Sequence, residues 1–218
     1  MKTDLQIDFV SDVACPWCAV GLNALETALL RLAPEVKAEL RFQPFELNPD
    51  MAAEGADAGK YLKAKYGMGD EQLARNRDVI RERGAAVGFS FGDRARVWNT
   101  FDAHRVLHWA GEPGQPPGAQ RALKHALLQA YHGEGRNPGA HDVLLDLAGR
   151  AGLEVAAAEE VLKSGRYGTE VRAAEHQWQQ AGISSVPAIV INGKHLISGG
   201  QPPEIFEKAL RQIASGQA

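Results

Sequence analysis

The chain has 218 residues, of which 44% are hydrophobic and 23% are charged. This balance is that of a compact globular protein with one elaborated domain or two small ones, and it argues against disorder. The formal net charge of −3 gives no electrostatic reason to expect nucleic acid or an anionic membrane as a partner. Neither partner is predicted.

The first residues and the cysteine content indicate a reducing compartment. Asp4 and Asp8 stand where a secretory signal needs an uninterrupted apolar core, and no later stretch is long enough to span a bilayer. We therefore expect a cytoplasmic protein. Its only cysteines are Cys15 and Cys18, and cytosolic thiols are kept reduced, so this pair indicates redox chemistry or metal binding rather than a structural disulfide.

The first predicted elements form a β-α-β unit. Alternating apolar residues predict a strand over residues 5–10, and a second strand fits residues 39–44. Between them an apolar stripe predicts a helix that ends before Pro34; its members are Cys18, Leu22, Leu25, Leu29 and Leu32. A helical crossover between two adjacent strands predicts that they are parallel.

The middle of the chain reads as helical, and the end returns to strands. Gly-rich turns separate the predicted helices, which cover residues 70–87, 99–109, 119–131, 141–151 and 155–162, with Asp70 and Asn99 as N-caps. A helix over 169–181, strands over 188–191 and 195–198 around an Asn-Gly turn, and a helix after Pro202 follow.

This order predicts an α/β protein, a thioredoxin fold interrupted by an inserted all-helical domain. Residues 1–57 would form the N-terminal part of the thioredoxin fold, residues 58–165 the insertion, and residues 166–218 the C-terminal part.

The sequence Cys15-Pro16-Trp17-Cys18 is the candidate reactive centre. Cys15 falls where a strand ends and a helix begins, so free N–H groups and the helix dipole favour its thiolate. Cys18 lies one turn further along the apolar stripe, within reach of a disulfide formed on Cys15. Cys15 is therefore the predicted nucleophile and Cys18 the resolving cysteine. Pro16 suits the first helical turn, and Trp17 is expected on the rim of the site.

These residues also fit other interpretations. Two buried cysteines can be plain packing residues. A zinc site needs four ligands, and no second C-x-x-C exists. His104 and His108 have the four-residue spacing of metal ligands on a helix, but such pairs more often pack or face solvent, and no metal is predicted.

A second candidate element is Val186-Pro187, where a proline opens an apolar strand. Alone, it fits an ordinary strand-start proline. Together with the C-x-x-C pair and the following Asn-Gly hairpin it is similar to the cis-proline loop of thioredoxin-fold enzymes. That similarity implies a cis bond beside the reactive cysteine and a Val186 backbone free to pair with an extended substrate.

Four separated motifs resemble the FrnE-like branch of the DsbA-family thiol oxidoreductases over almost the whole chain. They are Asp12 with residues 15–21, residues 44–49, residues 99–105, and residues 182–187 with 199–201. The resemblance implies dithiol-disulfide exchange, with Cys15, Cys18 and Pro187 at the functional positions. Ala19 departs from the aromatic residue that many members have there, and the signal peptide of secreted members is missing.

The predicted reaction is disulfide exchange with protein or small-molecule thiols and disulfides, without a metal or an organic cofactor. Glutathione is a candidate co-substrate, and a reducing pool of thiols favours reduction or isomerisation of disulfides. One alternative is a glutathione-dependent isomerase or transferase, resembling 2-hydroxychromene-2-carboxylate isomerase and the kappa-class transferases. A second alternative is a binding module whose docking face carries Arg75, Arg77, Arg81 and Arg83.

Overall fold

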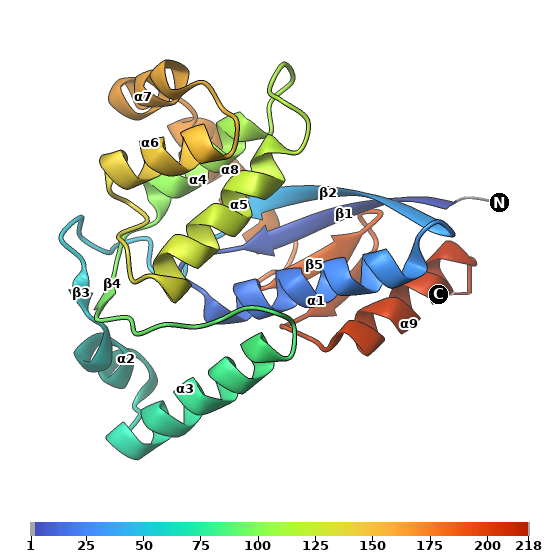
Figure 1. The fold of residues 1–218 in the computed structure, drawn as a ribbon, viewed down its shortest axis with the longest axis horizontal. Helices are drawn as coiled ribbons and strands as arrows, with labels where there is room; N and C mark the ends of the chain where they lie inside the picture. The colour runs from blue at the N-terminus through green and yellow to red at the C-terminus, as the bar shows by residue number, and fades with distance from the viewer. Residues whose placement is uncertain (1–2, 218) are drawn as a thin grey trace.

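The computed structural model describes residues 3–217, and its centre is a mixed β-sheet with helices packed against it (Figure 1). The sheet has four strands in the order β2-β1-β5-β6. Their bounds are Thr3–Ser11 for β1, Val36–Pro44 for β2, Ala188–Ile191 for β5 and His195–Ser198 for β6. β1 runs parallel to β2 and antiparallel to β5, and β5 and β6 form an antiparallel hairpin. The first and last parts of the chain therefore share one sheet.

One face of the sheet is apolar along its length, and the other is apolar around Val10, Ala188 and Val190. The helices that cover it are α1 (Pro16–Leu32), α8 (Gly168–Gln180) and α9 (Pro203–Ala214). Ile7 and Phe9 of β1 belong to the buried cluster that includes residues of α1 and α9. Val10 belongs to a separate cluster, against which Trp178 of α8 packs. Because neighbouring side chains of a strand point to opposite faces, α8 lies on the other side of the sheet from α1 and α9.

The middle of the chain forms two helical groups. Its helices are α2 (Ala58–Tyr66), α3 (Asp70–Ala85), α4 (Phe101–Ala110), α5 (Ala119–Leu128), α6 (His141–Arg150) and α7 (Val155–Ser164), with a π-helical turn at Gln129–Gly133. Helices α4 to α7 share an apolar core that is distinct from the core around α1. Helices α2 and α3 lie apart from that bundle, on the other side of α1 (Figure 1). Both groups contact α1, through α3 and α5.

The predicted α/β class, the parallel β1–β2 pair and the interrupted order of elements are confirmed. The division at residues 57/58 and 165/166 stays a prediction. Within residues 3–217, no helix combines the length and the apolar character needed to cross a membrane.

Three details of the prediction were wrong. The middle segment is not all-helical, because β4 (Arg96–Val97) pairs with β3 (Ala56–Asp57) in a short ribbon. Two-residue strands are too short to produce an alternating pattern of apolar residues. Helix α2, which the sequence did not reveal, buries only Ala58 and therefore has no helical periodicity of apolar residues. Asp70 is the first residue of α3 rather than its N-cap, which is Gly69.

Asn99 is also not the N-cap of α4, as predicted, but lies one residue before the N-cap position. Thr100 occupies the N-cap position of α4, but its side chain does not cap the helix. The Oδ1 atom of Asn99 instead accepts a hydrogen bond of 2.8 Å from the N–H of Phe101. Asn99 therefore satisfies a free N–H group at the start of α4, as a capping residue would.

Candidate functional site

The two cysteines lie at the first turn of α1. Cys15 is the N-cap residue, with φ −88° and ψ 114°, and Pro16 begins the helix. Proline suits this position because its missing N–H would have no partner inside the helix. The N–H of Cys18 donates to the carbonyl of Cys15 at 3.1 Å, and no acidic residue lies in the first turn. No carboxylate in this turn therefore neutralises the positive end of the helix dipole near Cys15.

Burial separates the roles of the two sulfurs. Cys15 is 4% exposed and lines an open cavity, whereas Cys18 is 0% exposed. Burial raises the pKa of the Cys18 thiol well above its usual value, and the hydrogen bond and the charge of Cys15 raise it further. Both residues are free thiols in the structure. Cys18 thus stays protonated while Cys15 offers the sulfur that a substrate can reach.

The loop before β5 closes the site over Cys15. The Sγ of Cys15 donates to the carbonyl of Val186 at 3.4 Å, and the Val186–Pro187 peptide bond is cis. Pro187 packs directly on α1, since a Cβ atom on Gly21 would lie 3.0 Å from Pro187 Cγ. Glycine at position 21 therefore lets the proline loop approach the cysteine helix. The structure thus brings together the residues predicted for the site: Cys15, Pro16, Trp17, Cys18, Val186 and Pro187.

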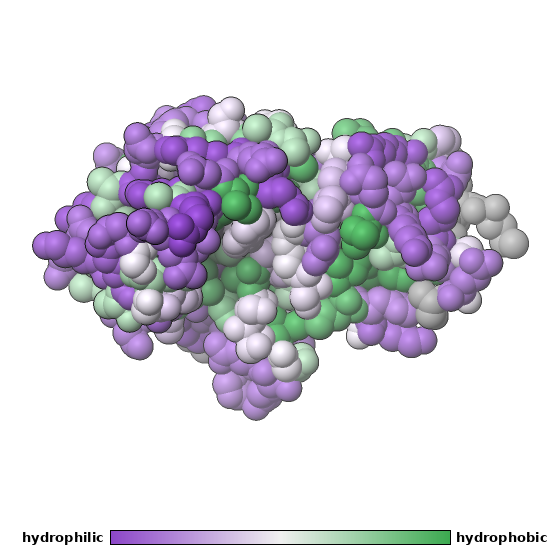
Figure 2. Space-filling model, turned by 90° about the horizontal axis from the view of Figure 1, so that it is seen from below, coloured by the Kyte–Doolittle hydropathy of each residue, from purple (hydrophilic) through white to green (hydrophobic). Residues whose placement is uncertain are grey.

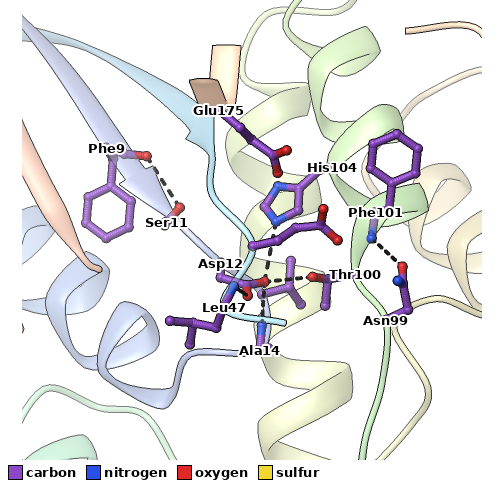
Figure 3. A network of polar contacts seen from close by, with 12 residues as sticks. Phe9, Ser11, Asp12, Ala14, Leu47, Asn99, Thr100, Phe101, His104 and Glu175 are labelled. Atoms are coloured by element: carbon purple, nitrogen blue, oxygen red, sulfur yellow. Dashed lines mark hydrogen bonds and ion pairs between the residues drawn. The ribbon is translucent and has the colours of Figure 1, made fainter. Parts of the chain in front are cut away.

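A buried carboxylate supports the turn that carries Cys15 (Figure 3). Asp12 is fully buried, and its Oδ1 accepts hydrogen bonds from the N–H of Ala14 at 3.0 Å and from Oγ1 of Thr100 at 2.9 Å. His104 Nε2 lies 3.4 Å from the same oxygen, and Oδ2 accepts from the N–H of Leu47 at 2.7 Å. Burial opposes the charge of Asp12, but these hydrogen bonds outweigh it and lower its pKa. Asp12 therefore ties the cysteine turn to α4 and to the loop after β2.

Two more buried groups near the cysteines were not found from the sequence. Lys124 of α5 is 1% exposed; burial lowers its pKa, and the negative charge of Asp12 opposes that shift. His132 donates from Nε2 to the carbonyl of Val13 at 2.8 Å, and burial lowers its pKa to about 3. His132 is therefore neutral. Neither residue belongs to a local motif, because only packing of the helices brings them under the site.

A third group missed by the sequence analysis is a pair of buried glutamates, Glu46 and Glu175, that share Arg172. The Nη1 atom of Arg172 contacts Oε2 of both, at 2.8 Å for Glu175. Within the described part of the chain, the Oε1 atom of each glutamate has no hydrogen-bond partner. Burial raises the pKa of Glu46 to about 7, and the charge of Glu175 raises it while His104 and Arg172 oppose the shift. One guanidinium thus serves two carboxyl groups, of which Glu46 lines the cavity beside Cys15.

The raised pKa of Glu46 predicts a pH-dependent stability. A carboxyl whose pKa is higher in the folded state contributes stability that is complete below its ordinary pKa of 4.5 and is lost as pH rises to about 7. Glu46→Gln removes this titration, so the variant should gain free energy of unfolding relative to the wild type between about pH 5 and about pH 8. Urea denaturation at both pH values measures the free energy of unfolding of the variant and the wild type. Glu39→Gln, on an exposed strand position, is the control, and equal pH dependence of E46Q and wild type would contradict the assignment.

The cavity beside Cys15 has a volume of about 680 Å³, within the range of small-molecule sites. Its walls are the start of α1, the loop before Pro187, residues 45–48, helices α2 and α3, and Arg94 with Val97. Figure 2 views the side of the molecule on which α2 and α3 lie and shows apolar side chains gathered along its middle, between hydrophilic surfaces. Helix α2, which the sequence did not reveal, is therefore part of the site.

The histidine pair does not act as a unit. His104 is buried against Asp12, whereas His108 is half-buried, stacks near Tyr167 and lies 3.6 Å from Glu112. Within residues 3–217, no group of three or more His, Cys, Asp or Glu side chains is placed to hold a metal ion.

The comparisons with known proteins agree with this geometry. The family model for the DSBA-like thioredoxin domain matches residues 6–211. The chain belongs to this family. A crystal structure of a probable DsbA oxidoreductase from Streptomyces coelicolor is similar to this DSBA-like protein, with 34% identity and a TM-score of 0.87 over 98% of this chain and 91% of that chain.

Two more distant structures share the fold of the DSBA-like protein. A 2-hydroxychromene-2-carboxylate isomerase has a TM-score of 0.74 at 17% identity, covering 97% of both chains. The cytosolic disulfide reductase DsbM from Pseudomonas aeruginosa, in a structure with GSH, has a TM-score of 0.64 at 16% identity, covering 96% of this chain and 99% of that chain. The predicted DsbA-family membership is thereby confirmed.

Proposed function

We propose that this DSBA-like protein is a thiol-disulfide oxidoreductase that works through Cys15 and Cys18. The observation that supports it is the placement of the Cys15 sulfur: it lies at the start of α1, faces the carbonyl of Val186 at 3.4 Å and lines an open cavity, with Cys18 buried behind it. A thiolate at a helix start, with a second cysteine one turn away, has the arrangement needed for disulfide exchange.

The reaction has two steps. The Cys15 thiolate attacks one sulfur of a substrate disulfide, forms a mixed disulfide and releases the other half as a thiolate. Cys18 then loses its proton and attacks the Cys15 sulfur, so the Cys15–Cys18 disulfide forms and the second half of the substrate leaves as a thiolate. Two electrons pass from the cysteine pair to the substrate, which takes up two protons, and the reverse steps oxidise a dithiol. No metal or organic cofactor enters either step.

We propose that the protein works in the cytosol and that this compartment sets the direction of the reaction. In a cytosolic glutathione pool, a pair of ordinary potential rests as the dithiol, which favours reduction or isomerisation of protein or small-molecule disulfides. Glutathione is a fitting co-substrate, and the similar fold of DsbM in a structure with GSH supports this choice. The backbone of Val186 would pair with the substrate beside the sulfur.

The test is the redox equilibrium of the cysteine pair in graded glutathione buffers. Samples are quenched with acid, alkylated and weighed by mass spectrometry. We expect a two-electron transition between dithiol and Cys15–Cys18 disulfide. A potential near the value of about −270 mV known for thioredoxin would support reduction, and one near the value of about −120 mV for DsbA would support oxidation. A protein in which the two cysteines never join at any buffer ratio would refute the proposal.

A second candidate function is a glutathione-dependent isomerase or transferase, favoured by the shared fold of 2-hydroxychromene-2-carboxylate isomerase. The start of α1 would then hold the thiolate of glutathione, and Cys18 would have no part in turnover. Isomerisation of an aromatic substrate by glutathione that persists in Cys18→Ser would favour this function. Absence of that activity in the wild type would favour disulfide exchange.

A further inference from the structure

The arginine-rich face of α3 has one member that differs from the rest. Arg75 pairs with Glu71 at 3.4 Å, and Arg81 pairs with Asp93 at 2.7 Å. Arg83 donates to the carbonyl of Gly200 at 3.1 Å and lies 6.0 Å from the ring centre of Trp17. The remaining member, Arg77, forms no hydrogen bond or ion pair with any residue between 3 and 217. Among these four arginines, only the guanidinium of Arg77 donates no hydrogen bond to another residue of the described part of the chain.

Arg77 lines the cavity that contains the Cys15 sulfur. It also lines a neighbouring cavity of about 300 Å³, which shares Pro16 and Arg94 with the first. Arg77 thus lies where the two cavities meet. A molecule held in the larger cavity with its sulfur at Cys15 would extend towards this guanidinium.

The charge of the larger cavity is positive. Its lining includes three cations, Lys65, Arg77 and Arg94. Lys65 Nζ donates to the carbonyl of Leu47 and to Asn48 Oδ1, both at 2.6 Å, and Arg94 donates to the carbonyl of Ala14 at 3.3 Å. These two cations are therefore already bound to neutral oxygens of the protein.

The lining of this cavity includes a single acidic residue, Glu46, and that carboxyl group is bound by Arg172. No lining carboxylate is therefore paired with Arg77, whose positive charge remains unbalanced. Arg77 is exposed, and a negatively charged group of a ligand would be attracted to it.

We propose that this cavity takes disulfides and thiols of low molecular mass that carry a carboxylate, and that Arg77 binds the carboxylate while the sulfur lies at Cys15. This inference deepens the proposed function and rests on it. The planar guanidinium matches a carboxylate through two parallel hydrogen bonds. A volume of about 680 Å³ suits a molecule of this class, and helices α2 and α3 form part of the cavity wall. Arg77 is accordingly a specificity residue.

The test compares two chromogenic disulfides that differ in charge. The dianion 5,5′-dithiobis(2-nitrobenzoate) carries a carboxylate on each ring, whereas 2,2′-dipyridyl disulfide is neutral. Stopped-flow absorbance measures the second-order rate constant of reduced protein with each. In Arg77→Gln we expect the constant for the dianion to fall about tenfold, the effect of losing roughly 1.4 kcal/mol of binding. The constant for the neutral disulfide should stay within about twofold, which also shows that the variant is folded and its thiolate intact.

The matched control is Arg75→Gln, which removes the same charge from the same helix at a residue outside the cavity. It should leave both constants within about twofold of wild type. Equal slowing of both probes by R77Q, an unchanged reaction with the dianion, or an equal loss in R75Q would each overturn the role of Arg77 while leaving the reactivity of wild type in place. A wild type that reacts with neither probe would overturn the proposed function itself, and with it this inference.

Discussion

Replacing Cys15 with serine is expected to abolish disulfide exchange. The hydroxyl of serine does not ionise near neutral pH and does not form a disulfide, and Cys18 is too buried to take over the attack. The rate of insulin reduction with dithiothreitol as the electron donor should fall by at least about 10³-fold, to the uncatalysed background. Turbidity of the released insulin chains measures it.

The change should act on chemistry and not on folding. Cys15 Sγ donates a hydrogen bond to the carbonyl of Val186, which a serine hydroxyl can also donate. The free energy of unfolding of C15S should therefore stay near that of the reduced wild type, as checked by urea denaturation. A folded C15S protein that still reduces insulin would disprove the assignment of the nucleophile.

Replacing Cys18 with serine is expected to arrest the reaction after its first step. Cys15 would still attack the substrate, but without the buried second sulfur the mixed disulfide would not be resolved within the protein. Turnover should drop by about 10²-fold or more, and a covalent adduct should accumulate. Intact-mass spectrometry measures the adduct, which reducing agent should release.

The double variant with both cysteines replaced by serine is the control, since it should capture nothing. Adducts isolated from C18S would also identify natural substrates. A C18S protein that turns over like wild type, or peptide mapping that locates the adduct anywhere other than Cys15, would contradict the two-step scheme.

The sequence predicted those parts of the site that depend on neighbours along the chain. Cys15, Pro16 and Cys18 lie at the end of a strand and the start of a helix, which local pattern reveals, and a proline at the start of an apolar strand marked the loop at Pro187. The resemblance to a family added the expectation that this loop lies beside Cys15. In the structure, the carbonyl of Val186 in this loop lies 3.4 Å from Cys15 Sγ.

The parts of the site that the sequence did not predict depend on how distant segments of the chain pack together. Glu46, Arg172 and Glu175 come together only because α8 packs near the end of β2. Lys124 reads as one polar residue on an amphipathic helix, and burial is decided by the neighbours of that helix. Four arginines on α3 looked alike in the sequence, yet their partners in space leave only Arg77 facing the cavity unpaired among the described residues.

The strand order has a consequence for the making of the protein on the ribosome. β1, the second strand in the sheet, gains its partner on one side from β2 soon after it, but its other partner, β5, is near the end of the chain. A nascent chain therefore displays the Cys15 thiol for most of its translation without the loop that covers it. Polypeptides that stop before residue 186 would carry the Cys15 thiol without the Val186 carbonyl that accepts its hydrogen bond.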